Sequence, residues 1–90
     1  MKTIWKYPLK VEDEQTIKMP AGSSILCVMT QYDRPCLWAK VDDSAPMVDV
    51  KILCYGTGRR VDESPLLTYL GTALLCQGNI VLHYFIAYAE

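Results

Sequence analysis

Residues 66–90 constrain the fold of this chain more than any other stretch. They form two long apolar segments separated by Gln77-Gly78-Asn79. The second segment, Ile80–Tyr88, is rich in β-branched and aromatic residues, which fit a pleated and half-buried surface. Gly78-Asn79 suits a two-residue turn that needs positive φ at its first central position. The sequence therefore predicts an antiparallel hairpin at this end of the chain.

A turn at Gly78-Asn79 fixes the register of that hairpin and sets Gln77 opposite Ile80. Small residues then lie opposite large ones. The predicted pairs are Leu75 with Leu82, Leu74 with His83, Ala73 with Tyr84, Gly71 with Ile86, and Tyr69 with Tyr88. Both faces of Ile80–Tyr88 are apolar, whereas an outer antiparallel strand usually alternates apolar and polar residues. We therefore expect this strand to be covered on both sides, by the core and by another element or another copy of the chain.

A helix at 65–76 is the alternative for the first segment. Ser64 suits the N-cap and Pro65 the first helical position, and the apolar residues that follow have helical spacing. Against the helix stand four residues that form helices poorly: Thr68, Tyr69, Gly71 and Thr72. The sequence favours a strand here and leaves an α+β fold as the alternative.

The rest of the chain also has the pattern of short strands. The expected strands are Thr3–Leu9, Gln15–Met19, Ser24–Thr30, Pro35–Val41 and Val48–Cys54. We expect the first two to form a hairpin around the charged turn at 12–14. A two-residue turn at Tyr32-Asp33 would place Cys27 opposite Trp38 and Met29 opposite Cys36. The prediction is a single all-β domain over residues 1–90, an antiparallel sandwich or open barrel of about seven strands.

Composition excludes several classes of function. The net charge is −1 with no basic excess, which disfavours binding to the nucleic-acid backbone. No apolar segment is long enough for a signal peptide or a membrane span, so we expect a cytoplasmic protein without membrane contact. The four cysteines, Cys27, Cys36, Cys54 and Cys76, form no C-x-x-C pair, and we expect buried, reduced thiols.

Little in the sequence points to catalysis. His83 is the only histidine, and a lone histidine within a strand is more often a packed residue bonded to a neighbour than a catalyst. No set of residues has the spacing of a metal site, and the carboxylates gather in turns, where they are usually solvated. We therefore expect no enzyme, no catalytic residue, no metal and no cofactor.

The segment after Cys54 is the candidate ligand-binding site. Two glycines let backbone N–H groups point into a concavity, and two arginines can grip a phosphate or carboxylate. The segment lacks the patterns of a nucleotide-hydrolase phosphate loop and of a dinucleotide-binding fold. The alternative is a plain turn with solvated arginines. The candidate residues are Tyr55, Gly56, Thr57, Gly58, Arg59 and Arg60.

The chain also carries many aromatic residues for its size, 10% of the sequence. Most must belong to the core, and those left over suit an interface or a surface on which a base can stack. Together with the strands that are apolar on both faces, they predict a homo-oligomer, most simply a two-fold dimer.

Four segments resemble a known family. They are Lys2–Leu9 (KTIWKYPL), Pro35–Ala39 (PCLWA), Tyr55–Gly58 (YGTG) and Tyr69–Thr72 (YLGT). In these segments the chain is similar to a family of short phage and prophage proteins of unknown function, and the likeness extends over nearly the whole chain. Members often carry Asn-Gly in place of Tyr32-Asp33 and histidine in place of Arg59.

The resemblance implies a setting rather than an activity: a small accessory protein in the cytoplasm of a phage-infected bacterium. Two hypotheses follow. The first is a non-catalytic protein that sequesters a small anionic ligand, such as a nucleotide signal of host immunity. The second is an inhibitor that blocks a host defence protein by direct contact, or a structural accessory protein.

Overall fold

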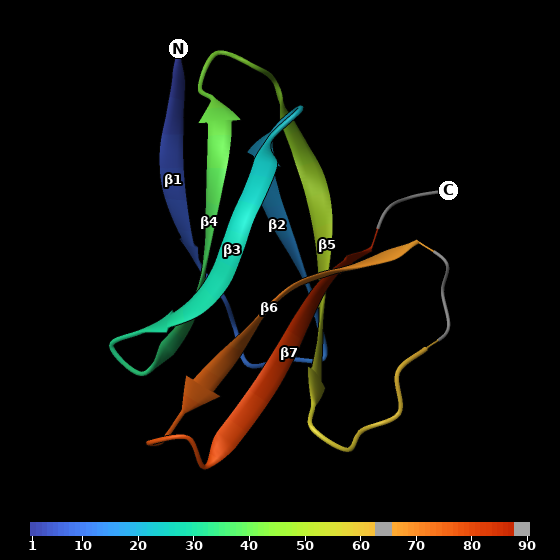
Figure 1. The fold of residues 1–90 in the computed structure, drawn as a ribbon. Helices are drawn as coiled ribbons and strands as arrows, with labels where there is room; N and C mark the ends of the chain where they lie inside the picture. The colour runs from blue at the N-terminus through green and yellow to red at the C-terminus, as the bar shows by residue number, and fades with distance from the viewer. Residues whose placement is uncertain (63–65, 88–90) are drawn as a thin grey trace.

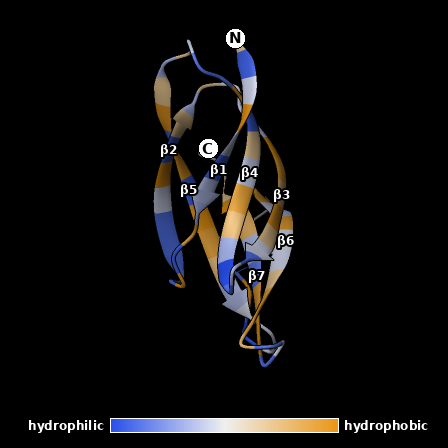
Figure 2. Cartoon of the chain, turned by 90° about the vertical axis from the view of Figure 1, so that its left-hand side faces the viewer, coloured by the Kyte–Doolittle hydropathy of each residue, from blue (hydrophilic) through white to orange (hydrophobic). Residues whose placement is uncertain are grey.

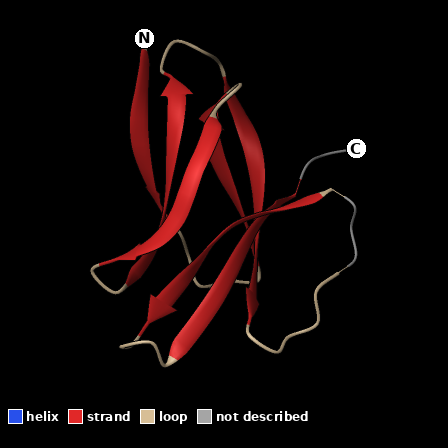
Figure 3. Ribbon diagram, viewed as in Figure 1, coloured by secondary structure: helices blue, strands red, loops and turns tan. Residues whose placement is uncertain are grey.

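The computed structural model describes residues 1–62 and 66–87, and in these the chain forms one sheet of seven strands and no helix. The sheet curls into a half-barrel (Figures 1 and 3). The strands are β1 (Lys2–Pro8), β2 (Glu14–Pro20), β3 (Ser24–Gln31), β4 (Arg34–Asp42), β5 (Met47–Gly56), β6 (Leu67–Leu75) and β7 (Ile80–Ala87). The predicted all-β fold is confirmed, in the form of the open barrel. Within the described residues there is accordingly no helix long and apolar enough to cross a bilayer.

The strands lie in the order β1-β4-β3-β6-β7-β5-β2. All neighbours are antiparallel except β3 and β6, which run parallel and pair at Val28 and Gly71. The Leu74 N–H of β6 also donates to Thr30 Oγ1 of β3 at 2.8 Å. The sheet is therefore mixed, where an antiparallel one was expected. The alternative of a helix at 65–76 is wrong, because Leu67–Leu75 is the strand that pairs with β7. Ser64, Pro65 and Tyr88 lie outside the described residues.

Hydrophobic residues recur along the strands (Figure 2), and the buried ones form a core on the concave face of the half-barrel. Alternate residues of each central strand point inward, as the period of a strand requires. Leu37, Ile52 and Tyr84 have no exposed surface. On β5, Ile52 and Cys54 are buried while Asp49 and Lys51 are exposed, so the strand is buried on one face.

The predicted hairpin between the first two strands is wrong. β1 pairs with β4 and β2 pairs with β5, so the two strands form opposite edges of the sheet. The connection crosses between the edges: Leu9 is buried and its N–H donates to the Pro35 carbonyl at 2.9 Å. The Tyr84 hydroxyl donates to the Lys10 carbonyl at 3.1 Å. These contacts to the core favour the crossing over a local turn.

The predicted register of the β6–β7 hairpin is also wrong. Leu75 pairs with Ile80, so the turn contains Cys76–Asn79 and is two residues longer than expected. The longer turn puts Cys76 and Gln77 at φ 52° and 59°. It is held from outside the hairpin, since the Cys76 N–H donates to Asp33 Oδ1 at 2.8 Å. The shift by two residues preserves which side chains face inward, and a bulge between Tyr69 and Gly71 displaces the pairing further.

The β3–β4 hairpin forms as predicted. Cys27 pairs with Trp38 and Met29 with Cys36. Tyr32 and Asp33 occupy the turn at φ 52° and 60°, the backbone conformation that a two-residue hairpin turn with two positive φ values needs.

The cysteines are all free, as expected, but they are not all buried. Cys36 and Cys54 are buried, Cys27 is half-buried and Cys76 is exposed. The exposure of Cys76 follows from the longer β6–β7 turn, which moves this residue out of the strand.

Candidate functional site

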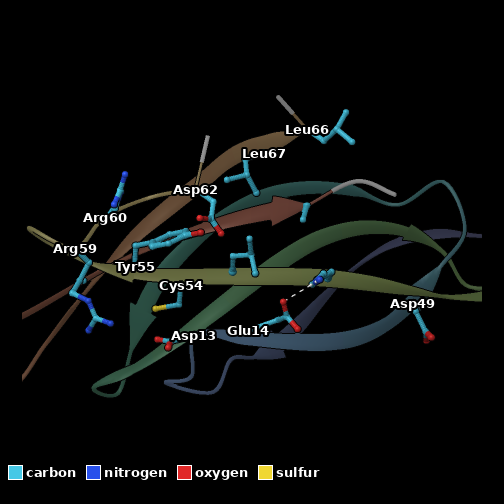
Figure 4. A pocket seen from close by; sticks show the side chains of 14 residues that line it. Asp13, Glu14, Asp49, Cys54, Tyr55, Arg59, Arg60, Asp62, Leu66 and Leu67 are labelled. Atoms are coloured by element: carbon cyan, nitrogen blue, oxygen red, sulfur yellow. Dashed lines mark ion pairs between the residues drawn. The ribbon is translucent and has the colours of Figure 1, made fainter. Parts of the chain in front are cut away.

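A groove of about 700 Å³ lies along β5, between the connection that precedes β2 and the segment that leads into β6 (Figure 4). The floor includes Leu53 and Tyr55 of β5, one wall includes Leu66 and Leu67, and charged side chains line the remaining surface. The charged residues are Asp13, Glu14, Asp49, Lys51, Arg59, Arg60 and Asp62. The groove therefore combines an aromatic ring, aliphatic walls and charges of both signs.

Four of the six predicted site residues line this groove: Tyr55, Gly56, Arg59 and Arg60. Thr57 and Gly58 do not. The loop turns tightly, because the Arg59 N–H donates to the Gly56 carbonyl at 3.0 Å and Gly58 has φ 88°. The Thr57 N–H donates to the Val81 carbonyl at 3.3 Å. These two N–H groups are engaged within the fold, so the expectation that backbone amides face a ligand does not hold for them.

The charges in the groove divide into paired and unpaired groups. Lys51 pairs with Glu14 at 3.0 Å, and Lys18 pairs with Asp49 at 2.8 Å. In the part of the chain that the structure describes, Arg59, Arg60, Asp13 and Asp62 enter no ion pair. Figure 4 shows Arg60 and Asp62 on the side of Leu67, across β5 from Asp13. These two guanidinium groups and two carboxylates belong to residues that are exposed to solvent.

The aromatic floor continues beyond the groove across the convex face of the sheet. The Tyr55 ring packs edge-on against Phe85 with ring centres 5.8 Å apart, and Phe85 packs edge-on against Tyr69 at 5.5 Å. Edge-to-face contacts at this spacing are favourable for aromatic rings. The contact with Phe85 helps to hold the Tyr55 ring in place.

His83 is a packed residue bonded to its neighbours, as the sequence predicts, and pairs with Thr72 rather than with Leu74. Its Nε2 is hydrogen-bonded to Thr57 Oγ1 at 2.7 Å and its Nδ1 to Thr72 Oγ1 at 3.0 Å. A further hydrogen bond joins Thr72 Oγ1 to the Tyr69 hydroxyl. Because Thr57 belongs to the loop that carries the two arginines, His83 ties that loop to the sheet.

Two ionisable groups behind the groove are unsuited to chemistry at neutral pH. Burial raises the pKa of the Cys54 thiol, so this sulfur stays protonated and is a poor nucleophile. Burial also raises the pKa of the neighbouring Tyr84. Among the described residues, no cluster of three or more histidine, cysteine, aspartate or glutamate side chains is arranged to hold a metal ion.

Sequence reasoning missed the acidic side of the groove. Asp13 and Glu14 lie 40 and 39 residues before Leu53 in the sequence. They reach the groove because Glu14 pairs with Leu53 across β2 and β5. No local pattern predicts that pairing. The hydrogen bond between Thr57 and His83 could not be predicted from the sequence either, because each residue alone has a common structural explanation.

Comparison with known proteins gives a family and no activity. A family model described as a domain of unknown function, DUF7352, matches residues 1–90. No curated protein and no solved structure matches the chain. This match confirms that the chain resembles a family of unknown function over its whole length. The chain belongs to the DUF7352 family.

Proposed function

We propose that the protein binds a small anionic ligand of the nucleotide class in the groove along β5 and sequesters it without turnover. The observation that carries this proposal is the position of Arg59 and Arg60. Both line a groove whose floor includes the Tyr55 ring, and neither enters an ion pair among the described residues. Given the resemblance to phage proteins, we propose a nucleotide signal of host defence as the ligand, bound in the cytoplasm of the infected bacterium.

The chemistry of the groove suits the two ends of a nucleotide. Guanidinium groups bind phosphate through charge-assisted hydrogen bonds, often two at a time. An aromatic ring offers a stacking surface for a base, which contributes about 1–3 kcal/mol per base. The volume of about 700 Å³ falls within the range of small-molecule sites.

Sequestration is proposed in preference to turnover because two residues that often act as base or nucleophile, His83 and Cys54, are already hydrogen-bonded or held protonated. Both ring nitrogens of His83 are hydrogen-bonded to threonine hydroxyls. The Cys54 thiol is held protonated by burial, which raises its pKa. A nucleophile needs an adjacent base or a lowered pKa, and neither residue meets that requirement.

Isothermal titration calorimetry against a panel of cyclic and linear mononucleotides tests the proposal. We expect at least one to bind, and we expect the double variant Arg59→Ala/Arg60→Ala to bind it at least about 100-fold more weakly, since each charge-assisted hydrogen bond contributes about 1.5–3 kcal/mol. Chromatography of the ligand after release should return it unchanged.

Arg34→Ala is the matched control. Arg34 is exposed in the β3–β4 hairpin and does not line the groove, so its removal changes the net charge without changing the site. If Arg34→Ala weakened nucleotide binding as much as the double variant does, the loss of affinity would follow from net charge and not from the groove. Full binding by the double variant, or hydrolysis of the ligand, would overturn the proposal.

A second function is favoured by a different observation: apolar side chains are exposed on the central strands β3 and β6. Leu26, Met29, Tyr69 and Leu74 are between 52% and 58% exposed. We propose as the alternative that this surface, the outer apolar patch, contacts a host defence protein or another component of a phage assembly. A host protein retained at equal stoichiometry by the wild type, and lost from Met29→Asp/Leu74→Asp, would support it.

A further inference from the structure

We propose that the open edge of β1 receives an extended acidic segment of another protein as an additional strand. This interaction surface is separate from the groove along β5. β1 lies at one end of the strand order and, among the described residues, pairs only with β4 (Figure 1). An open edge of this kind is a template on which a further strand can pair through its backbone.

The hydrogen bonds at both ends of the β1–β4 ladder show which residues direct their backbone groups to the open edge. The Asp43 N–H donates to the Met1 carbonyl at 3.1 Å, and the Leu9 N–H donates to the Pro35 carbonyl at 2.9 Å. Alternate residues of an antiparallel strand bond to the same neighbour, and the register runs without a shift. The odd-numbered residues of β1 thus bond to β4. The even-numbered residues face the open edge: Lys2, Ile4, Lys6 and Pro8.

Positive charge follows this edge. Lys2 and Lys6 flank Ile4 along the strand, and Lys40 of β4 lies opposite Ile4. All three lysines are exposed, and within the described part of the chain none of them enters an ion pair. The Lys6 ammonium donates to the neutral Gln31 Oε1 at 2.9 Å, which leaves its charge uncompensated. An acidic strand laid along β1 complements these charges.

One carboxylate lies near the start of this edge. Asp42 is opposite Lys2 in the ladder, but it accepts hydrogen bonds from the amino terminus at 3.4 Å and from the Ser44 hydroxyl at 2.7 Å. It lessens the positive charge around Lys2 and not that around Lys6. The acid opposite Lys6 should therefore contribute more to recognition than the acid opposite Lys2.

The same charges disfavour a second copy of β1 as the added strand. If two β1 strands paired antiparallel about Ile4, Lys2 of each would lie opposite Lys6 of the other, and like charges directly opposite are destabilising. The strand at the other end of the sheet, β2, carries charges of both signs that are already in ion pairs with β5. The occupant that fits is an acidic segment of a different protein.

Apolar side chains on both faces of β1 set the rest of the partner's pattern. Ile4 is 58% exposed on the convex face, and Trp5 is 36% exposed on the concave face. Because successive side chains point to opposite faces, the partner carries two acids that flank a β-branched residue opposite Ile4, with β-branched residues between them beside Trp5. An exposed ion pair contributes little alone, so the backbone bonds supply affinity and the side chains select the sequence.

Calorimetry with an acetylated and amidated peptide, Thr-Glu-Thr-Val-Thr-Glu-Thr, tests the proposal on the full chain. Its two glutamates lie opposite Lys2 and Lys6 when its valine lies opposite Ile4. We expect this peptide to bind. We expect the peptide with both glutamates replaced by lysine to bind at least about tenfold more weakly, because opposite charges across a strand pair attract and like charges repel.

A backbone methyl group distinguishes strand addition from simple attraction between charges. N-methylation of the peptide's valine removes a hydrogen bond to β1, whereas N-methylation of the threonine after it alters a group that points away from β1. We expect the first change to weaken binding at least about tenfold and the second to leave it within about twofold. Equal effects of the two methyl groups would overturn strand addition.

The variant Lys2→Glu/Lys6→Glu tests the same edge from the protein's side. We expect it to prefer the lysine peptide to the glutamate peptide, a gain that an unfolded protein cannot show. Lys10→Glu/Lys18→Glu is the matched control, because it makes the same change in net charge at exposed lysines outside β1. The control should keep the wild-type preference.

Three results would overturn the proposal from the side of the protein. They are no binding of the glutamate peptide to the wild type, an unchanged preference in Lys2→Glu/Lys6→Glu, and a reversed preference in the control. Affinity for the peptide that falls as the protein is concentrated would also overturn it, because the edge would then be covered by a second copy of the chain.

Discussion

Gly71 permits the one parallel contact in the sheet. A Cβ atom at this position would lie 2.4 Å from the Val28 carbonyl oxygen and 2.9 Å from the Val28 nitrogen. Both are backbone atoms, which cannot turn away as a flexible side chain can. Because β3 and β6 pair at Val28 and Gly71, the absence of a side chain here lets the two halves of the half-barrel come together. The Leu74 N–H also donates to Thr30 Oγ1 across the same two strands, at 2.8 Å.

The substitution Gly71→Ala should therefore destabilise the fold. We expect the free energy of unfolding to fall by about 3 kcal/mol, at the upper end of the usual cost of overpacking. Urea denaturation followed by tryptophan fluorescence measures it. Gly56→Ala is the matched control, since a Cβ there meets only Arg59 Cγ at 3.6 Å. A loss no greater than that of the control would show that β3 and β6 can move apart at little cost.

At the scale of the element, the β3–β4 turn keeps a residue that its backbone disfavours. Tyr32 has φ 52° and is 90% exposed. Asparagine tolerates this left-handed conformation better than tyrosine. We expect Tyr32→Asn to raise the free energy of unfolding by about 0.5–1 kcal/mol, seen as a higher urea midpoint with an unchanged slope.

Asp33 provides the comparison for that prediction. Asp33→Gly also relieves a positive φ, but it removes the acceptor of the Cys76 N–H, a hydrogen bond of 2.8 Å. The two effects oppose each other, so its gain should be smaller than that of Tyr32→Asn. A larger gain from Asp33→Gly would mean that the link between the two turns contributes nothing.

These elements show what local sequence can and cannot predict. Residue type and side-chain alternation together predicted all seven strands, and the β3–β4 register followed from a turn whose residues fit it. The β6–β7 turn was predicted two residues too short because its partner, Asp33, lies 43 residues away. In the groove, Arg59 and Arg60 come from one loop and were predicted, whereas Asp13 arrives through the pairing of β2 with β5.

At the scale of the whole molecule, a single curved sheet has two faces, and its own core covers only one of them. The described chain measures 39 × 32 × 16 Å, so the short dimension holds little more than one layer of core between the two arms of the sheet. The concave face supplies that core. The convex face retains apolar residues with nothing over them, among them Met29 at 58% and Leu74 at 54% exposed.

We propose that two copies of the chain pair through the outer apolar patch. Apolar surface of this kind on a small protein marks an interaction site, because its removal from water is favourable. Sedimentation velocity at micromolar concentration should show a dimer, and Met29→Lys/Leu74→Lys should shift it to monomer, since two lysines on each copy would face each other across a two-fold interface. Met47→Lys is the matched control, because Met47 is 52% exposed at the start of β5, outside the patch. The dimer would be ruled out if the wild type were a monomer at this concentration, or if Met47→Lys dissociated it as fully as the double variant. The outer apolar patch would then be assigned to contact with another protein.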